Sequence, residues 1–287
     1  MRHEEGTFKT HDGEALYTQW WLPDDAGKIK AHLAVVHGLG EHSGRYEDFA
    51  AWFVPRGYAV HAFDLRGHGQ SPGQRGYIRE WEDFRGDVGV FLKEVQQRAD
   101  MVKDVPLFLI SHSLGGLTVL EYGLFGDVDM LSGLVASAPA LARGEGVSPL
   151  VMLAGKVLAR FAPQKRLEVG LDVQGLSRNP DVVQAYRDDP LVHGWGTPSG
   201  AVAIDRAMKR TVAHAEAWPD DLPLLIVHGG ADPICPPTAS ARFYANVRSP
   251  DKMRHEYLHF RHEVFNEVGR EKVLEDVRIW LADHLPG

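Results

Sequence analysis

Apolar runs that read as strands alternate along this chain with segments that read as helices, and this order constrains the fold more than any other feature. Several strand-like runs are continuously apolar, as expected of strands covered on both faces. Strands are predicted at Ala15–Leu22, Ala31–His37, Tyr58–Phe63, Leu107–Ile110, Leu131–Ser137 and Leu222–His228, with a weaker candidate at Arg254–Leu258. Helices are predicted at Tyr46–Val54, Trp81–Val102, Leu114–Phe125, Ser240–Val247 and Glu271–His284. This order predicts an α/β fold class with a mostly parallel central sheet flanked by helices.

Two regions depart from the simple alternation. The first two predicted strands are joined by a short turn around Pro23–Lys28, so this edge of the sheet is expected to be antiparallel. Residues 140–219 contain helical patterns and loops without a convincing strand, and strand-like runs resume at Leu222. We therefore expect a core domain of residues 1–139 and 220–287, interrupted by an inserted helical cap of residues 140–219.

Composition narrows the class of protein. The 287 residues are 44% hydrophobic and carry a formal net charge of −8, which argues against a nucleic-acid surface. Cys235 is the only cysteine, so no intrachain disulfide can form. The N-terminal residues lack the apolar stretch of a signal peptide, and no run reaches the roughly 18 apolar residues of a spanning helix. The default expectation is a soluble cytoplasmic protein, and peripheral contact with a membrane stays open.

Residues 106–118 are the most informative stretch for chemistry. An apolar run ends near Ser111, Ser113 follows at a corner, and Gly115 and Gly116 open a helical pattern. A strand, a tight turn and a helix with serine at the apex place a nucleophilic hydroxyl at a sheet edge. The usual pattern is Gly-x-Ser-x-Gly, and here Ser111 stands in place of the first glycine. We expect Ser111 to be accommodated in the turn, with a hydrogen bond inside it.

A nucleophilic serine needs a base to take its proton and an acid to orient that base. Asp232 is the candidate acid, because it follows an apolar strand and two glycines at the sheet edge where sites of open α/β sheets lie. Its alternative role is to open a turn before Pro233. His262 is the candidate base and lies one helix and one strand further on. His259 is its rival, but it lies closer to the strand end and is expected to be structural.

Backbone N–H groups are expected to stabilise the oxyanion of such a reaction. Leu114 N–H opens the helix after the nucleophile, and Leu39 N–H lies in the glycine-rich loop after an earlier strand. His37 is expected to fix this loop by a hydrogen bond. The segment from Asp64 to Ser71 also combines an acid, a histidine and glycines, but it precedes the nucleophile and is expected to be a structural turn.

Metal and phosphate chemistry have little support. The chain contains neither His-Glu-x-x-His nor paired cysteines, and it has no Gly-x-x-x-x-Gly-Lys-Ser/Thr loop. No metal ligands are therefore predicted. Cys235, three residues after Asp232, is either a reactive thiol near the site or a small buried hydrophobic residue.

Four strings together resemble the monoacylglycerol lipases, within the lysophospholipase-like branch of the α/β-hydrolases. They lie at residues 37–46, 111–116, 230–232 and 262–267, and the resemblance spans roughly Phe8 to Leu285. It implies a Ser113–Asp232–His262 triad, an oxyanion hole at Leu39 and Leu114, and no cofactor. It also places Cys235 where related lipases carry a cysteine near the site.

The cap is expected to select the substrate. Ser148 and Pro149 can begin an amphipathic helix that runs to Phe161, with basic residues within and just after it. This helix is expected to pack on the core, to serve as a lid that lines an acyl-chain tunnel and contacts a lipid surface, or to do both. Leu150, Met152 and Leu153 are candidate walls for an acyl chain. Glu41 and Arg45 are candidate contacts for glycerol hydroxyls.

The expected function is hydrolysis of monoacylglycerols or similar single-chain esters by a serine carboxylester hydrolase with a small lipid-ester substrate. The alternatives left open are a short-chain carboxylesterase, a serine aminopeptidase and a binding protein on an inactive hydrolase fold. Aspartate-nucleophile dehalogenase and epoxide hydrolase chemistry is disfavoured, because the elbow carries serine. The oligomeric state is not predicted.

Overall fold

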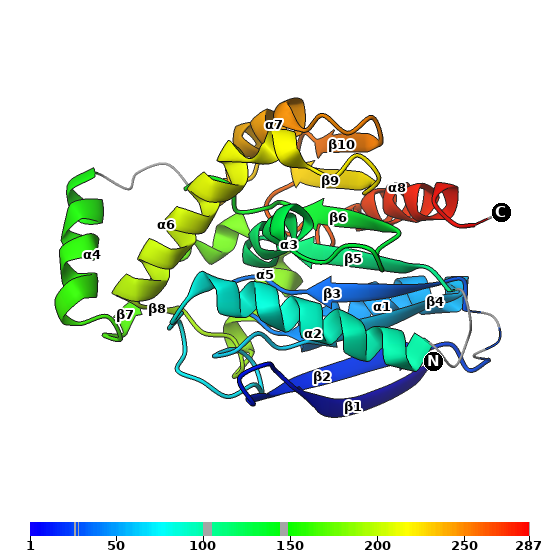
Figure 1. Ribbon diagram of the computed structural model, residues 1–287, viewed down its shortest axis with the longest axis horizontal. Coiled ribbons are helices and arrows are strands. Elements are labelled where there is room, and N and C mark those ends of the chain that lie inside the picture. The colour runs from blue at the N-terminus through cyan, green and yellow to red at the C-terminus, as the bar shows by residue number, and fades with distance from the viewer. Residues whose placement is uncertain (26, 28, 100–104, 144–148, 287) are drawn as a thin grey trace.

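The central feature of the fold is a sheet of eight strands in the order β1-β2-β4-β3-β5-β6-β9-β10 (Figure 1). The computed structural model describes the chain except residues 26, 28, 100–104, 144–148 and 287, and it describes residues 99 and 149–154 by their backbone alone. The strands are β1 (Arg2–Lys9), β2 (Ala15–Leu22), β3 (Ala31–Val36), β4 (Tyr58–Phe63), β5 (Leu107–His112), β6 (Gly133–Ser137), β9 (Leu224–Gly229) and β10 (Lys252–Tyr257). From β4 to β10 every neighbouring pair is parallel, which confirms the predicted mostly parallel sheet.

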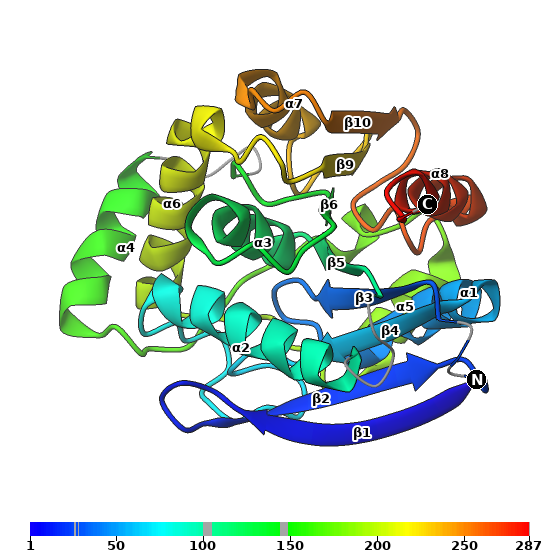
Figure 2. The ribbon, with the colours of Figure 1, turned by 45° about the vertical axis from the view of Figure 1, so that its right-hand side comes forward.

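Helices cover both faces of this sheet (Figure 2). Alternate residues of β3 divide between two apolar clusters: Ala34 and Val36 lie with α2 and α3, whereas Leu33 and Val35 lie with α1 and α8. Such two-sided burial explains why the parallel strands are continuously apolar in sequence. The helices of the core are α1 (Glu47–Phe53), α2 (Trp81–Ala99), α3 (Leu114–Phe125), α7 (Pro237–Asn246) and α8 (Arg270–Asp283).

The antiparallel edge differs in part from expectation. β2 is antiparallel to its neighbours, as predicted, but those neighbours are β1 and β4 rather than β3. The turn around Pro23–Lys28 therefore connects strands that are not paired. The sequence reading also missed β1. Phe8 is its one buried residue, so no alternation of apolar and polar residues marks this edge strand, which is held by backbone pairing with β2.

Helix positions agree with the sequence pattern to within a few residues. The bounds predicted for α3 are those observed. α7 begins at Pro237 rather than Ser240, because proline fits the first turn of a helix, where its missing N–H is not needed. The helix predicted to reach Val102 is described to Ala99, and the rest of that prediction lies outside the described residues.

The described part of the predicted cap, residues 140–219, forms α4 (Pro149–Phe161), β7 (Leu167–Glu168), the 3-10 turn η4 (Val173–Gly175), α5 (Pro180–Asp188), β8 (Trp195–Gly196), α6 (Pro198–Ala213) and η5 (Ala215–Ala217). Of these elements, α4, β7 and β8 lie on the side toward which the parallel strands run (Figure 1). β7 and β8 pair as a short antiparallel ladder, which the sequence reading did not expect. α6 packs on α2 and α3, and α4 packs on α6. Among the described residues, the helices fall short of the length and apolarity that a bilayer-spanning segment needs.

Candidate active site

Ser113 stands at the sharp turn between β5 and α3. Its backbone has φ 54° and ψ −115°, a conformation that residues with a side chain rarely adopt. The Ser113 N–H donates to the Ser137 carbonyl at 2.9 Å, and the Ser113 carbonyl accepts from Ala140 N–H at 3.0 Å. These bonds hold the strained turn, as expected where backbone strain serves a functional site.

The glycines of the elbow are required by close packing. A Cβ on Gly115 would collide with the Val36 and His37 carbonyls, and a Cβ on Gly116 would lie 2.8 Å from Pro139 Cα. Ser111, by contrast, is fully buried in β5 and donates from Oγ to the Val135 carbonyl on β6 at 3.1 Å. The expected hydrogen bond within the turn is therefore wrong, because the side chain points to the neighbouring strand. The backbone of the elbow is formed without a glycine at residue 111.

Asp232 and His262 are brought together from the loops after β9 and β10. His262 Nδ1 lies 2.7 Å from Asp232 Oδ2. Asp232 Oδ1 also accepts from Ile234 N–H at 2.8 Å and Cys235 N–H at 3.0 Å. Burial alone would raise the pKa of this carboxyl, but the charge of His262 and the hydrogen bonds from His228 and His262 hold the pKa well below its usual range. An ionised Asp232 can only accept, so it fixes the proton of His262 on Nδ1.

Ser113, His262, Leu39 and Leu114 line one cavity of about 580 Å³ at the carboxyl ends of the strands. Leu114 is the first residue of α3, where the N–H groups have no acceptor within the helix. Asp232 lies behind His262 and does not line the cavity. His259 is exposed and does not line the cavity, so of the two candidate bases His262 is the one that shares the cavity with Ser113.

His112 contacts the ring of His262, and the sequence reading did not single it out. The two ring centroids are 4.6 Å apart, and His112 Nδ1 lies 3.2 Å from Ser137 Oγ. Burial and the neighbouring His262 lower the pKa of His112 to about 4, so this imidazole is neutral at physiological pH.

The loop after β3 is held by a buried ionic network. Glu41 Oε1 accepts from Gly38 N–H at 2.6 Å and from the Tyr46 hydroxyl at 3.1 Å. Arg45 Nη1 donates to Glu41 Oε2 at 2.6 Å, and both Arg45 amino groups donate to Glu263 at 2.8 Å. Burial opposes ionisation of Glu41, but Arg45 lowers its pKa to about 2. Glu41 and Arg45, the candidate contacts for glycerol hydroxyls, both line the cavity, but protein donors already occupy both Glu41 oxygens.

His37 and Asp64 have the structural roles expected of them. His37 Nε2 accepts from Leu65 N–H at 2.9 Å, and its Nδ1 lies 2.7 Å from the Gly38 carbonyl. The Asp64 carboxylate accepts from Ser43 N–H and Gln70 N–H, both at 2.7 Å. Both residues thus fix the loops that flank the cavity.

Cys235 lines the cavity and is 5% exposed. Burial and the nearby Asp232 charge raise the pKa of its thiol above the usual range. The thiolate is the reactive form of cysteine, so this environment favours the alternative of a buried hydrophobic residue.

The apolar wall of the cavity comes from residues that the sequence reading missed. Leu171, Val173, Leu176, Ile204, Met208 and Ile234 line it. Ile204 and Met208 stand four residues apart on α6, a spacing that places both on one helix face. The predicted wall residues Leu150, Met152 and Leu153 belong to α4, and their side chains lie outside the described part of the structure.

One cluster of possible metal ligands occurs among the described residues, away from this cavity. It consists of His11, Asp12 and Asp83. Asp12 is paired with Arg66 Nη1 at 3.0 Å and with Arg79 Nη2 at 3.2 Å, so arginines already neutralise its carboxylate.

Three features lie together at the carboxyl ends of a mostly parallel sheet. They are a strained serine on a strand–helix elbow, an aspartate–histidine pair and a glycine-rich loop. Fold and site together define a serine hydrolase with the α/β-hydrolase fold. The chain belongs to the family described as serine aminopeptidase, S33, which matches residues 27–269.

Comparison with individual relatives is more specific. The chain is 36% identical to a monoacylglycerol lipase of Mycolicibacterium smegmatis, over 98% of both chains. It is 34% identical to the human monoglyceride lipase, over 94% of this chain and 88% of that protein. The solved structure of the Paleococcus ferrophilus monoacylglycerol lipase is 34% identical, covers 99% of this chain and superposes with a TM-score of 0.79. The predicted resemblance to the monoacylglycerol lipase family is therefore confirmed.

Proposed function

We propose that this protein is a serine carboxylester hydrolase that cleaves monoacylglycerols or similar single-chain fatty-acid esters through an acyl-enzyme. The observation that carries the proposal is the Asp232–His262 pair, with 2.7 Å between Oδ2 and Nδ1, whose histidine lines the same cavity as Ser113. The relatives named monoacylglycerol lipase and monoglyceride lipase support the choice of ester.

The proposed reaction has two halves. Ser113 Oγ attacks the ester carbonyl while His262 Nε2 takes the hydroxyl proton, and His262 then passes this proton to the departing glycerol oxygen. A water attacks the acyl-serine with His262 again as base, and the fatty acid leaves as Ser113 regains its proton. Asp232 orients His262 and stabilises the imidazolium. Leu39 and Leu114 N–H groups are proposed to donate to the oxyanion.

The cap is proposed to supply the acyl-chain site. The cavity has apolar walls from α6 and from the segment around η4, which suits a single alkyl chain beside the nucleophile. We assign residues 140–219 to this cap and residues 1–139 and 220–287 to the core. Glu41, Arg45 and Cys235 stay candidate substrate contacts from the core side, and Leu150, Met152 and Leu153 stay candidates from α4.

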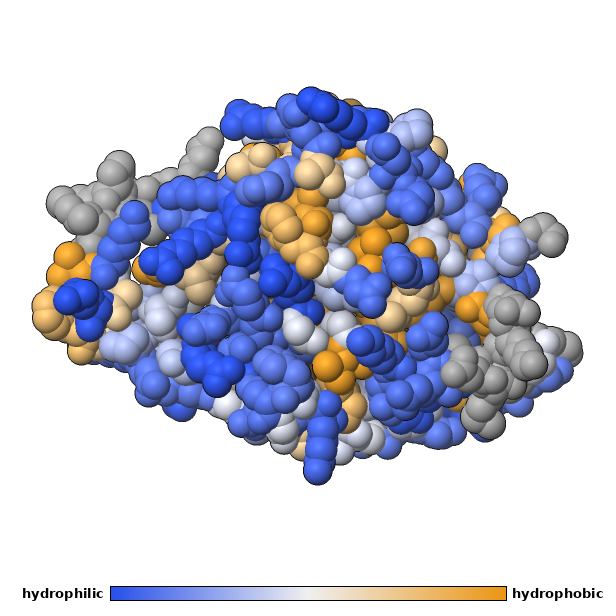
Figure 3. Space-filling view, in the orientation of Figure 1, coloured by the Kyte–Doolittle hydropathy of each residue, from blue (hydrophilic) through white to orange (hydrophobic). Residues whose placement is uncertain are grey.

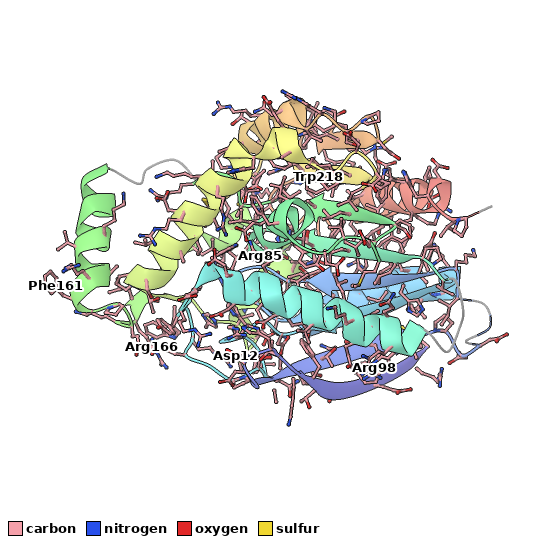
Figure 4. The ribbon with its side chains drawn as sticks, viewed as in Figure 1. Asp12, Arg85, Arg98, Phe161, Arg166 and Trp218 are labelled. Atoms are coloured by element: carbon pink, nitrogen blue, oxygen red, sulfur yellow. The ribbon has the colours of Figure 1, made fainter. Side chains whose placement is uncertain are left out.

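The outer end of the cap is proposed to contact a lipid surface. Phe161 is 79% exposed and Val157 is 53% exposed on α4. Lys156, Arg160, Lys165 and Arg166 are exposed around them. Figure 3 shows apolar and polar atoms side by side at this end, and Figure 4 shows Phe161 and Arg166 there. Exposed apolar side chains ringed by basic ones suit an anionic lipid interface.

Activity-based labelling tests the assignment of the nucleophile. A fluorophosphonate probe should label wild-type protein at Ser113, and Ser113→Ala should lose both labelling and turnover while keeping its melting temperature. Ser111→Ala is a matched control, because it removes a hydroxyl two residues away that lies buried in β5. Labelling of the Ser113→Ala protein, or retained turnover, would refute the assignment.

A substrate panel separates the candidate functions. Monoacylglycerols of different chain length should be cleaved faster than short-chain esters, and amino-acid anilides should not be cleaved. Preference for anilides would favour the aminopeptidase alternative. Preference for short-chain esters would favour the carboxylesterase alternative. For the lipid surface, Phe161→Asp should reduce co-sedimentation with anionic vesicles without changing turnover of a dispersed short ester.

A further inference from the structure

The loop that carries His262 is hydrogen-bonded to the cap through its main chain. His262 N–H donates to the Gly175 carbonyl at 3.2 Å, and Glu263 N–H donates to the Leu176 carbonyl at 2.8 Å. Gly175 ends η4 and is packed so tightly that a Cβ there would lie 2.7 Å from Pro233 Cγ. This piece of the cap therefore sits between the turn of Asp232 and the loop of His262.

Glu267 stands at the centre of this junction, 2% exposed. Its Oε1 accepts from the Ser177 hydroxyl at 3.2 Å, from Arg178 N–H at 2.9 Å and from Val268 N–H at 2.7 Å. Its Oε2 accepts from Arg178 N–H at 3.1 Å and from Arg261 N–H at 3.0 Å. One carboxylate thus joins two residues of the cap to the residue before His262.

Arginine side chains reinforce the same junction from both sides. The Arg261 guanidinium donates to the Gln174 carbonyl at 2.6 Å and to the Ser177 carbonyl at 3.1 Å. Arg178 Nε lies 3.4 Å from Glu267 Oε1, and its Nη2 donates to the Val268 carbonyl at 3.1 Å. The contacts therefore cross between cap and core in both directions.

Glu267, Ser177 and Arg178 do not line the cavity, so this junction has no direct part in holding a substrate. Leu176 does line it, and the Leu176 carbonyl accepts from Glu263 N–H. A displacement of the cap wall at Leu176 would therefore act on the backbone of residues 262 and 263.

We infer that Glu267 is a positioning residue that makes the placement of His262 depend on the docked cap. It holds residues 177–178 of the cap and residue 261 of the histidine loop on one buried carboxylate. The inference rests on the proposed role of His262 as general base. When the junction loosens, His262 leaves its productive position between Asp232 and Ser113.

Glu121→Gln provides a matched control for Glu267→Gln. Glu121 on α3 is also a buried carboxylate that ties the cap to the core, through Arg210 on α6. Among the described residues its ion-pair partners are Arg85 and Arg210, neither of which belongs to the histidine loop, and it does not line the cavity. Both changes replace a charged acceptor by an amide of the same shape, so both remove a buried ionic tie between cap and core.

The two variants are compared with a short, dispersed ester that does not depend on the acyl-chain site. Glu267→Gln should lower kcat by roughly tenfold or more with KM nearly unchanged, because small displacements of catalytic groups have large kinetic effects. It should also move the acidic limb of the kcat/KM profile, since a looser contact with Asp232 stabilises the charged imidazole less. Glu121→Gln should keep kcat and the acidic limb within about twofold of wild type.

Equal behaviour of the two variants would overturn the inference, because Glu267 would then be one tie among others. If Glu267→Gln does not fold, Arg261→Ala tests the same junction from the other side and should lower kcat in the same direction. Failure of the proposed function is recognised separately, because wild-type protein would then show no esterase activity and no labelling of Ser113.

Discussion

Arg45 donates to both carboxylate oxygens of Glu263 at 2.8 Å, and Glu263 directly follows His262 in the chain. The same guanidinium reaches Glu41, which in turn accepts from Gly38 N–H in the proposed oxyanion loop. Tyr186 of the cap lies against it, with 4.7 Å from Arg45 Cζ to the ring centroid. One largely enclosed cation, with its side chain 11% exposed, therefore connects the proposed oxyanion loop, the histidine loop and the cap.

Arg45→Ala should destabilise the protein strongly, because it leaves two buried carboxylates without their counter-charge. Removing one partner of a buried ion pair costs about 3–5 kcal/mol. Urea unfolding followed by circular dichroism measures the loss. Arg45→Lys keeps the charge but cannot hold Glu263 through two parallel hydrogen bonds, so it should fall between wild type and Arg45→Ala. Equal stability of Arg45→Ala and wild type would contradict this account.

Asp232→Asn should reduce kcat by about 10⁴-fold, because the amide no longer fixes the proton on His262 Nδ1. Single-turnover hydrolysis of a chromogenic ester gives the rate of acylation. The variant should still bind substrate, since Asp232 lies behind His262 and not in the cavity. A fall in kcat of tenfold or less would show that another group orients the base.

Stability should decline when the pH falls below about 6.5, the ordinary pKa of histidine. Burial lowers the pKa of His32, His112 and His193 to about 4 in the folded protein, and that of His61 lies well below its usual value. Unfolded chains therefore bind more protons than the folded protein between about pH 4 and 6.5. The stabilisation is fully present above this window and is lost on acidification through it.

Urea unfolding at intervals from pH 7.5 to 4.5 measures this loss. Each such histidine contributes up to about 1.4 kcal/mol per pH unit inside the window. His61 Nε2 lies 2.8 Å from His32 Nδ1, and His61→Asn keeps a hydrogen-bonding group there. The variant should have a shallower pH dependence than wild type. If the unfolding free energy of the variant depends on pH as steeply as that of wild type, His61 does not contribute to the loss of stability.

Ser111→Gly should be tolerated with a small loss of stability. The change restores the usual elbow residue, but it removes the hydrogen bond from Ser111 Oγ to the Val135 carbonyl and adds backbone freedom to β5. The two effects together cost about 1–2 kcal/mol. Thermal unfolding measures the loss of stability. The rate of fluorophosphonate labelling measures the reactivity of Ser113, and it should stay within about twofold of wild type. Severely slowed labelling would mean that Ser111 shapes the nucleophile itself.

Local patterns were enough to predict the proposed nucleophile, acid and base. Ser113, Asp232 and His262 each follow a strand that runs into the same edge of a parallel sheet, so their order along the chain already implied their proximity. The bounds of α3 were predicted because Gly115 and Gly116 mark its start against an apolar strand. These signals are short-range and depend on residue type.

Features set by distant contacts were not predicted. β1 carries little buried surface, and the pairing of β2 with β4 depends on strand order rather than on the turn that follows β2. Glu267 ends the 262–267 string that resembles the family. An acidic residue in a loop, however, gives no sign that its carboxylate oxygens will accept hydrogen bonds from a cap segment 89 residues earlier in the chain. Ser111 was expected to bond locally, and only the neighbouring strand explains why it does not.

The hydrogen bonds from His262 and Glu263 to the carbonyls of Gly175 and Leu176 set a rule for recombination of this scaffold. A chimaera that grafts a foreign cap onto this core would separate residues 173–178 from the 261–268 loop built to receive them. Exchange of acyl-chain specificity between relatives should therefore succeed when both segments travel together as one cassette. Grafts of the cap alone should yield folded proteins with poor turnover.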